Sequence, residues 1–452
     1  MPAGSNKRAA STPRRLRETD VSFELGSAAD PVGRIFYWDD RVFRQVRDPA
    51  AWERCVGLLR QPEAQGLFDR GLIETWIPPD VRLEGSAGVL EHKKIGFVST
   101  APEWTSDMLW DAARMYADLA IALAKLGFGL KDGHVWNVLF DFCAPKMIDF
   151  GSIVPEFGTS WLDEFRIHFV APLSLMRHDL TSAIGRELLF EHHHGVGRRL
   201  LSGPGAAFPL SFGPTRLRHR ISTFRKSRSG MVAALERLSG YVERLEPAHR
   251  KERWANYTQD PSGETSGQQR KTDAVRAALD RFSPRTVLDM GTNKGRYAFL
   301  SAERGCDVAA FDYEEYNANF VYGVAKPKKL RVLPAVMNFR LPTPPSGVAL
   351  SVRSAYERYR SDLTLVLGMV HHLRLHQALP FPHIAETISL YTKTASVVEF
   401  VHPDDPHLSS WTIPAGYSMD AFVAEMARKR LRLVEETRAL PTRSVLLFES
   451  SP

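Results

Sequence analysis

The alternation of apolar and polar positions predicts a small sheet and several helices in the first half of the chain. Residues 34–46 form two short alternating runs around Asp39 and Asp40, which predicts a β-hairpin. Apolar positions recur at helical spacing in four further segments, namely 50–70, 107–126, 160–200 and 230–246. Helices therefore dominate the first half as the pattern predicts it.

In the second half, short apolar runs alternate regularly with helical patterns. The runs that predict strands are 286–290, 307–311, 331–336, 363–368, 396–401, 431–437 and 444–449. This alternation predicts a parallel sheet with helices on both faces, closed by a last pair of strands. Between the halves, Pro247 to about Thr272 is polar and rich in Gln, Ser and Gly, which is typical of a linker.

One strand ends in a glycine turn. Thr286–Met290 contains the acid Asp289 and leads into a turn with Gly291 and Gly295. Such glycines allow a tight turn and a close approach to a ligand, as in Rossmann-like cofactor sites. Asn293 stands where a dinucleotide fingerprint requires its second glycine, and no glycine follows at the third position. The turn therefore favours S-adenosylmethionine (SAM) over NAD.

The next apolar run ends in a second acid, Asp312. In a doubly wound sheet, an acid about 20 residues beyond the glycine turn is placed to hold ribose hydroxyls. The alternative is a carboxylate that caps the following helix or faces solvent. Because strand, turn, helix, strand and acid occur in order, we favour the ribose interpretation.

Composition changes this picture little. The 452 residues predict two or three domains, and 44% hydrophobic with 25% charged residues is ordinary for a globular protein. Three cysteines without metal or pairing logic, and a basic N-terminus without an apolar core, predict a cytoplasmic protein. No apolar run reaches membrane-spanning length.

The net charge of +7 is concentrated in part in the segment 216–228. Such a segment could bind nucleic acid, an anionic lipid or a phosphorylated substrate, but a solvated helix face is the interpretation that we favour. Since aromatic interleaving, zinc-finger spacing and an RNA-binding signature are all missing from the sequence, nucleic acid is not the favoured partner.

From about residue 270 to the end, the chain resembles class I SAM-dependent methyltransferases, and among them the rhizobial host-specific nodulation methyltransferases. The segments that carry the resemblance are 287–291, 293–297, 338–347, 362–373 and 398–406. The resemblance implies a Rossmann-like seven-stranded sheet in a domain of residues 273–452. It also implies that SAM is held by Asp289, Gly291, Asn293, Gly295, Asp312, Asn338 and Gly368. Many methyltransferases carry an acid at the position of Asn338. Asn338 itself could bind the adenine only as a neutral amide.

Two histidines are the candidates for a catalytic base. His371 and His372 follow the fourth strand, at the carboxyl edge where sheet ligands bind. A neutral imidazole there could take the proton from an acceptor hydroxyl. The alternative is that one histidine packs against the cofactor or caps the next helix.

Other sequence features reduce the range of possible methyl acceptors. Glu399 and His402 end the fifth strand, and Asp404 with Asp405 could order a metal or a substrate hydroxyl, although a solvated turn is the plainer interpretation. The sequence lacks the Asp/Asn-Pro-Pro-Tyr/Phe tetrad of amino-directed nucleic-acid enzymes and the Pro-Cys nucleophile of pyrimidine C5 methylation. A hydroxyl of a small molecule or a glycan is therefore the favoured acceptor.

The first half carries a second set of motifs. Asp132 and Asn137 are followed by a strand and by Asp149-Phe150-Gly151, a pattern that resembles the protein-kinase catalytic core. The resemblance implies an α+β kinase-like domain over residues 21–246, after a basic tail of residues 1–20. In it Asp132 would orient an acceptor hydroxyl, while Asn137 and Asp149 would hold magnesium beside ATP.

The kinase pattern is incomplete. The histidine before the loop acid and the glycine-rich phosphate loop are missing, and Arg44 stands near the place of the phosphate-binding lysine. Three interpretations stay open: an inactive domain, a docking module for a substrate or partner, and a kinase of small molecules.

Overall fold

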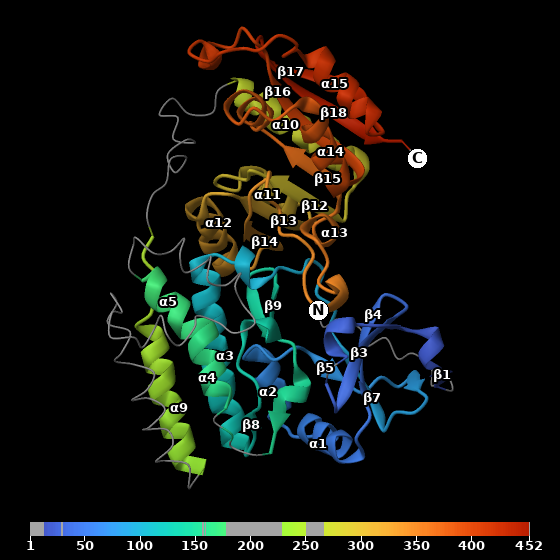
Figure 1. Ribbon diagram of the computed structural model, residues 1–452, viewed down its shortest axis with the longest axis vertical. Helices are drawn as coiled ribbons and strands as arrows, with labels where there is room; N and C mark the ends of the chain where they lie inside the picture. The colour runs from blue at the N-terminus through green and yellow to red at the C-terminus, as the bar shows by residue number, and fades with distance from the viewer. Residues whose placement is uncertain are drawn as a thin grey trace, which may run out of the picture.

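In the computed structural model, the described residues are 13–28, 30–155, 158, 160–177, 228–249 and 266–451. Figure 1 shows the N-terminal half below and the C-terminal half above it. The basic segment 216–228 lies outside the described residues except for Arg228, and so do the later part of the predicted helix 160–200 and residues 250–265 of the predicted linker.

The N-terminal half contains a five-stranded antiparallel sheet. Its order is β2 (Ser22–Phe23), β3 (Gly33–Trp38), β4 (Arg41–Val46), β7 (Gly88–His92) and β5 (Thr75–Trp76). The β3–β4 hairpin confirms the prediction for residues 34–46. Four short elements and two helices accompany the sheet: β1 (Arg14–Leu16), β6 (Val81–Leu83), η1 (Glu18–Asp20), η2 (Leu25–Ser27), α1 (Pro49–Leu59) and α2 (Ala64–Asp69).

A long helix, α3 (Ser106–Leu126), forms the centre of this half. It begins where the Thr105 side chain accepts a hydrogen bond from the backbone N–H of Met108, and it ends at Gly127, whose φ is +90°. The elements that surround it are η3 (Ala101–Glu103), β8 (Gly129–Leu130), η4 (Val135–Asn137), β9 (Val138–Asp141), β10 (Ala144–Met147), η5 (Phe150–Ser152), β11 (Ile153–Val154), α4 (Trp161–Phe165), η6 (Arg166–Val170), α5 (Ala171–Met176) and α9 (Arg228–Glu243).

The C-terminal half contains the seven-stranded sheet that the sequence predicts. The order is β14 (Val332–Val336), β13 (Asp307–Asp312), β12 (Thr286–Met290), β15 (Ser361–Val366), β16 (Thr392–Val401), β18 (Arg443–Ser450) and β17 (Leu431–Leu440). The first five strands are parallel and the closing pair is antiparallel. The helical elements are α10 (Ser266–Phe282), α11 (Arg296–Glu303), α12 (Glu315–Lys328), η8 (Val348–Leu350), α13 (Ala355–Arg358), η9 (His372–His376), α14 (Phe381–Tyr391), η10 (Pro406–Leu408) and α15 (Met419–Arg428).

Helix α10 begins inside the segment that the sequence predicts to be a linker. Residues 266–272 form its first two turns and are mostly polar. The buried residues Thr272, Val275 and Leu279 lie three and four residues apart, on one face of the helix. Arg270 donates a hydrogen bond to the carbonyl of Ala439, which fixes these turns against the sheet. Composition alone predicts a linker here because only one face of the helix is apolar.

The two halves share one hydrophobic core. Trp104 packs edge-on against Phe140 at 5.0 Å between ring centroids, and Phe140 contacts Tyr322 of the C-terminal half at 6.4 Å. The Tyr322 hydroxyl donates to Asp111 of α3 at 2.6 Å, and Lys326 forms an ion pair with the same carboxylate. The first turns of α3 are thereby tied to α12, the helix that follows the second strand of the C-terminal sheet.

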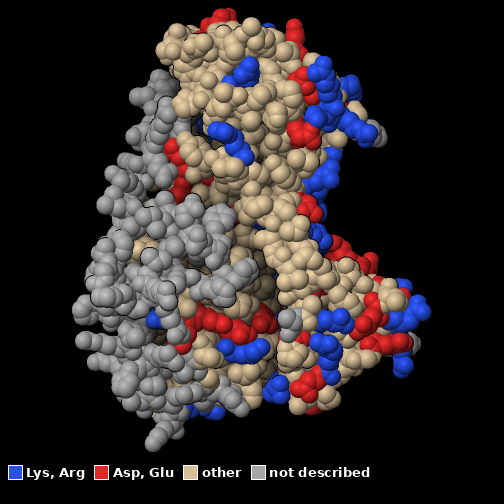
Figure 2. All heavy atoms as spheres, in the orientation of Figure 1, with Lys and Arg blue, Asp and Glu red and all other residues tan. Residues whose placement is uncertain are grey.

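The visible surface carries both signs of charge. On the face in Figure 2, basic side chains are interspersed with acidic ones over the lower half and along the right-hand side. Where the described residues form this face, neither sign makes up a broad surface of its own. None of the helices among the described residues has both the length and the apolar character needed to cross a membrane.

Candidate functional site

The glycine turn between β12 and α11 brings the backbone close to the loop that follows β15, the neighbouring strand in the sheet. Gly291 and Gly295 have φ values of +65° and +77°, and Asn293 adopts +49°. An ideal Cβ on Gly291 would lie 2.5 Å from the Sδ atom of Met369. Residues other than glycine rarely adopt such backbone angles. A larger residue at Gly291 would therefore strain the turn and crowd the Met369 side chain.

Two buried carboxyls face this turn. Asp289 accepts a hydrogen bond from the Thr292 hydroxyl at 2.7 Å, and Asp312 accepts from the backbone N–H of Asn293 at 2.9 Å. Burial raises the pKa of Asp289 to about 7 and that of Asp312 to about 6. Asp312 also accepts from the N–H of Glu314, so the end of β13 and the glycine turn form one connected loop cluster.

The remaining cofactor candidates lie after neighbouring strands of the same edge. Asn338 follows β14, and its side-chain oxygen accepts from the N–H of Arg340 at 2.9 Å. Gly368 follows β15 with a φ of +71°. The structure thus brings all seven predicted cofactor residues to the carboxyl ends of β14, β13, β12 and β15, which are adjacent in the sheet.

The two histidines lie at this edge with a tryptophan beside them. The rings of His371 and His372 are 4.1 Å apart, and Trp411 lies 5.4 Å from His372 and 6.1 Å from His371. His371 is buried, and its Nδ1 has no hydrogen-bond partner among the described residues. Burial, with His372 and Arg443 beside it, lowers the pKa of His371 to about 2, which keeps this imidazole neutral. His372 is only partly buried.

Two acids of β16 and the loop after it, Glu399 and Asp405, are bound by protein groups. Glu399 forms a buried ion pair with Lys271 of α10. Asp405 accepts from Arg443 and Thr442 at 2.8 Å each, and although burial opposes it, these bonds hold the pKa of Asp405 at about 2. Within the described ranges, no group of three or more His, Cys, Asp or Glu side chains is arranged to hold a metal.

Three residues of this edge are missing from the sequence-based prediction. Met369 packs over the glycine turn, Lys271 neutralises Glu399, and Trp411 flanks the histidines. The buried stripe of α10 is a signal that could have found Lys271. Trp411 lies in a loop after η10, where no periodic pattern points to a role.

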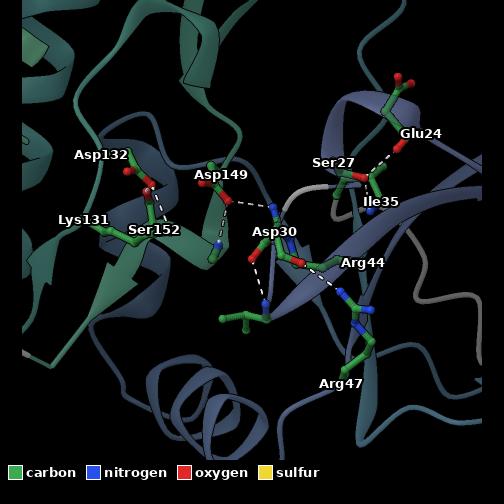
Figure 3. A network of polar contacts seen from close by, with 12 residues as sticks. Glu24, Ser27, Asp30, Ile35, Arg44, Arg47, Lys131, Asp132, Asp149 and Ser152 are labelled. Atoms are coloured by element: carbon green, nitrogen blue, oxygen red, sulfur yellow. Dashed lines mark hydrogen bonds and ion pairs between the residues drawn. The ribbon is translucent and has the colours of Figure 1, made fainter. Parts of the chain in front are cut away.

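The structure also brings the kinase-like residues together. The Tyr116 hydroxyl of α3 donates to the backbone carbonyl of Asp132, and burial, followed by the charges of Asp149 and Asp132, raises the pKa of its phenol. Asn137 is buried in the same region. Asp132 accepts from the Ser152 hydroxyl at 2.8 Å. Asp149 accepts through Oδ1 from Arg44 at 2.7 Å and from the N–H of Gly151 at 3.1 Å (Figure 3).

This arrangement does not fit a magnesium ion on Asn137 and Asp149. The Oδ1 atom of Asp149 already accepts from the guanidinium of Arg44 and from the N–H of Gly151. Magnesium needs several oxygen ligands in octahedral geometry. Among the described residues, no three or more His, Cys, Asp or Glu side chains are grouped so that they could supply these ligands together.

The sequence of this chain is distantly similar to that of a known protein. No family model matches the chain. The nodulation protein NoeA of Rhizobium meliloti (strain 1021) is 24% identical over 469 aligned residues, which cover 94% of this chain and 96% of NoeA. The similarity therefore extends over both halves of the molecule.

Three solved structures are similar to parts of the chain. An N1-methyltransferase for 1,6-didemethyltoxoflavin from Burkholderia thailandensis, with bound S-adenosylhomocysteine, has 16% identity and a TM-score of 0.33 and covers 44% of this chain and 84% of its own. The N-methyltransferase NodS from Bradyrhizobium japonicum WM9 has 13% and 0.32, with coverage of 43% and 99%. The bifunctional kinase-methyltransferase WbdD has 17% and 0.30, with coverage of 40% and 38%.

Proposed function

We propose that the C-terminal domain is a SAM-dependent methyltransferase that methylates a hydroxyl of a small molecule or a glycan. The observation that carries the proposal is the loop cluster formed by the glycine turn, Asp289 and Asp312 at the carboxyl edge of the sheet. Such an edge is where doubly wound sheets bind ligands. In this proposal Asp312 binds the ribose hydroxyls, and the glycine turn lets the backbone approach the amino-acid portion of the cofactor closely.

SAM, when bound, supplies an electrophilic methyl group on a sulfonium. The protein then has to align the acceptor, exclude water and accept one proton. His372 takes the role of base in this proposal, because it is only partly buried and lies beside Trp411. The buried His371 packs against it, with 4.1 Å between the two ring centroids.

Trp411 gives the acceptor a surface to stack on. Its indole is partly buried and lies within 6.1 Å of three imidazoles, those of His371, His372 and His376. A sugar or aromatic ring can pack on such a face while its hydroxyl points to a histidine. This geometry favours a ring-bearing acceptor.

Replacing His372 tests the base. His372→Gln is expected to lower the rate of methyl transfer about 10²–10⁴-fold, because it removes the proton acceptor, while binding of S-adenosylhomocysteine stays unchanged. The measurement uses tritiated SAM and a panel of phenols, catechols and oligosaccharides. His383→Gln, on α14 and outside the site, is the control and should retain full activity.

The outcomes of this assay separate the parts of the proposal. Label recovered on an amine, or no label on any hydroxyl acceptor with wild-type protein, contradicts O-methylation. Full activity of His372→Gln contradicts the base assignment alone.

Cofactor affinity should depend on pH through Asp312. Ribose hydroxyls donate to a carboxylate, so binding favours the ionised form of a group whose pKa is raised to about 6. The dissociation constant of S-adenosylhomocysteine is therefore expected to be constant above pH 7 and to rise by up to about tenfold per pH unit below 6. Calorimetry across pH checks this. Asp312→Asn should bind weakly with a flat profile, whereas a wild-type profile that is flat throughout would exclude the carboxylate from the site.

A further inference from the structure

Arg44 binds Asp149, the acid that the resemblance to kinases expects to hold magnesium. It stands in the middle of β4, and its side chain is 6% exposed. One guanidinium nitrogen, Nη1, donates to Asp30 at 2.8 Å, and the other, Nη2, donates to Asp149 at 2.7 Å. Figure 3 shows the guanidinium between the two carboxylates.

The surroundings are shaped to accept this guanidinium. A Cβ on Gly151 would lie 2.6 Å from Nη1 of Arg44, so the glycine leaves the space that the cation fills. His92 is fully buried nearby, and burial followed by the charge of Arg44 lowers its pKa to about 3, which leaves it neutral. The site therefore contains one buried cation and no competing positive charge from His92.

The bridge joins two parts of the N-terminal half that are far apart in sequence. Arg44 belongs to the five-stranded sheet, whereas Asp149 follows β10 and begins the short helix η5. Asp132, the other kinase-like acid, is held in the same region by the Ser152 hydroxyl and by the ammonium of Lys131 at 3.7 Å. Both acids are thus engaged by groups of the protein itself.

We propose that Arg44 is a built-in substitute for the metal ion at Asp149. Its guanidinium ties the sheet to the segment that carries Asp149 and closes the N-terminal half without nucleotide or magnesium. This half then transfers no phosphate and serves as a rigid support for the C-terminal domain. The proposal does not depend on the methyl-transfer proposal, since it rests on contacts within the N-terminal half alone.

Arg44→Met should therefore destabilise the protein. Breaking a buried pair leaves two carboxylates without their cation, and the melting temperature of the full chain is expected to fall by roughly 6 °C or more. Arg47→Met is the matched control, because Arg47 follows the same strand and is exposed, and its guanidinium donates to the backbone carbonyl of Asp30 and not to a carboxylate. It should melt within about 2 °C of wild type.

Gly151→Ala is a second variant that leaves every charge in place. Its methyl group enters the space of the guanidinium, so it should lower the melting temperature in the same direction as Arg44→Met. If Arg44→Met and Gly151→Ala both melt with Arg47→Met, the bridge does not hold the domain closed and the proposal fails.

The metal part of the proposal is tested on wild-type protein. Addition of magnesium alone, ATP alone or both together at millimolar concentration should leave the melting temperature unchanged, and calorimetry with magnesium and ATP should give no binding heat. Stabilisation by ATP that requires magnesium and is lost in Asp149→Asn would overturn the proposal, because Arg44 would then have to release the acid.

Discussion

Gly291→Arg is expected to abolish the binding of S-adenosylhomocysteine by the full-length protein. Gly291 has a φ of +65°, and a Cβ there would lie 2.5 Å from Sδ and 2.9 Å from Cγ of Met369. The substitution therefore strains the backbone and fills the turn at the point where a ligand approaches. Strain of this kind costs about 1–3 kcal/mol, and with the added steric clash we expect affinity to fall at least about 100-fold in calorimetry.

The control for this substitution is Gly305→Arg. Gly305 has a φ of +85° and connects α11 with β13, but a Cβ there meets no atom within 4 Å. It therefore imposes similar backbone strain without obstructing the glycine turn, and its affinity should stay within about twofold of wild type. If both variants bind alike, Gly291 does not line the cofactor site.

The second large effect is expected at the contact between the two halves. Glu103 of η3 is fully buried and forms a bidentate ion pair with Arg358, whose side chain is 4% exposed. The Tyr359 hydroxyl donates to Glu103 at 2.7 Å, and so does the backbone N–H of Thr100 at 2.8 Å. Burial acts to raise the pKa of Glu103, but Arg358 and the N–H of Thr100 hold it below its ordinary value.

Glu103→Gln should therefore lower the free energy of unfolding by about 3–5 kcal/mol, because it leaves Arg358 buried without a counter-charge. Urea denaturation followed by tryptophan fluorescence measures the loss. Glu243→Gln is the control, since Glu243 pairs with the partly exposed Arg114 and its loss should cost less than about 1 kcal/mol. Equal stability of the two variants would show that the Glu103–Arg358 pair does not hold the halves together.

This ion pair has a further consequence for pH dependence. The folded-state pKa of Glu103 is depressed, so its contribution to stability is present above the pKa of the unfolded chain and is lost as pH falls through the folded value. Between neutral and acid pH, the free energy of unfolding of Glu103→Gln should therefore fall by less than that of the wild type.

The sequence predicts the C-terminal sheet well because its parallel strands β12, β13, β14 and β15 are buried at nearly every residue. The apolar run Val308–Phe311 of β13, for example, has few alternatives to a central parallel strand. Residues 266–272 show the limit of this reasoning: their polar composition outweighs the single buried face that makes them helical. The pattern predicts elements from local periodicity, and a helix that packs through few residues escapes it.

The candidate site follows the same division. Asp289, Asp312 and the glycines occur at fixed spacing after strands, so their meeting at one edge follows from the topology. Trp411 and Met369 reach the site through loops whose course depends on tertiary packing. The partner of Asp149 is a third case: Arg44 lies 105 residues away in sequence, and the chain around it gives no signal that the two side chains meet.

The central claim is that the carboxyl edge of the seven-stranded sheet binds SAM. The most direct test is a pair of calorimetric titrations of the full-length wild-type protein, one with S-adenosylhomocysteine and one with NAD⁺. We expect saturable binding of S-adenosylhomocysteine at one site per chain and no heat from NAD⁺. Binding of NAD⁺ alone, or the absence of heat with both ligands, would contradict it.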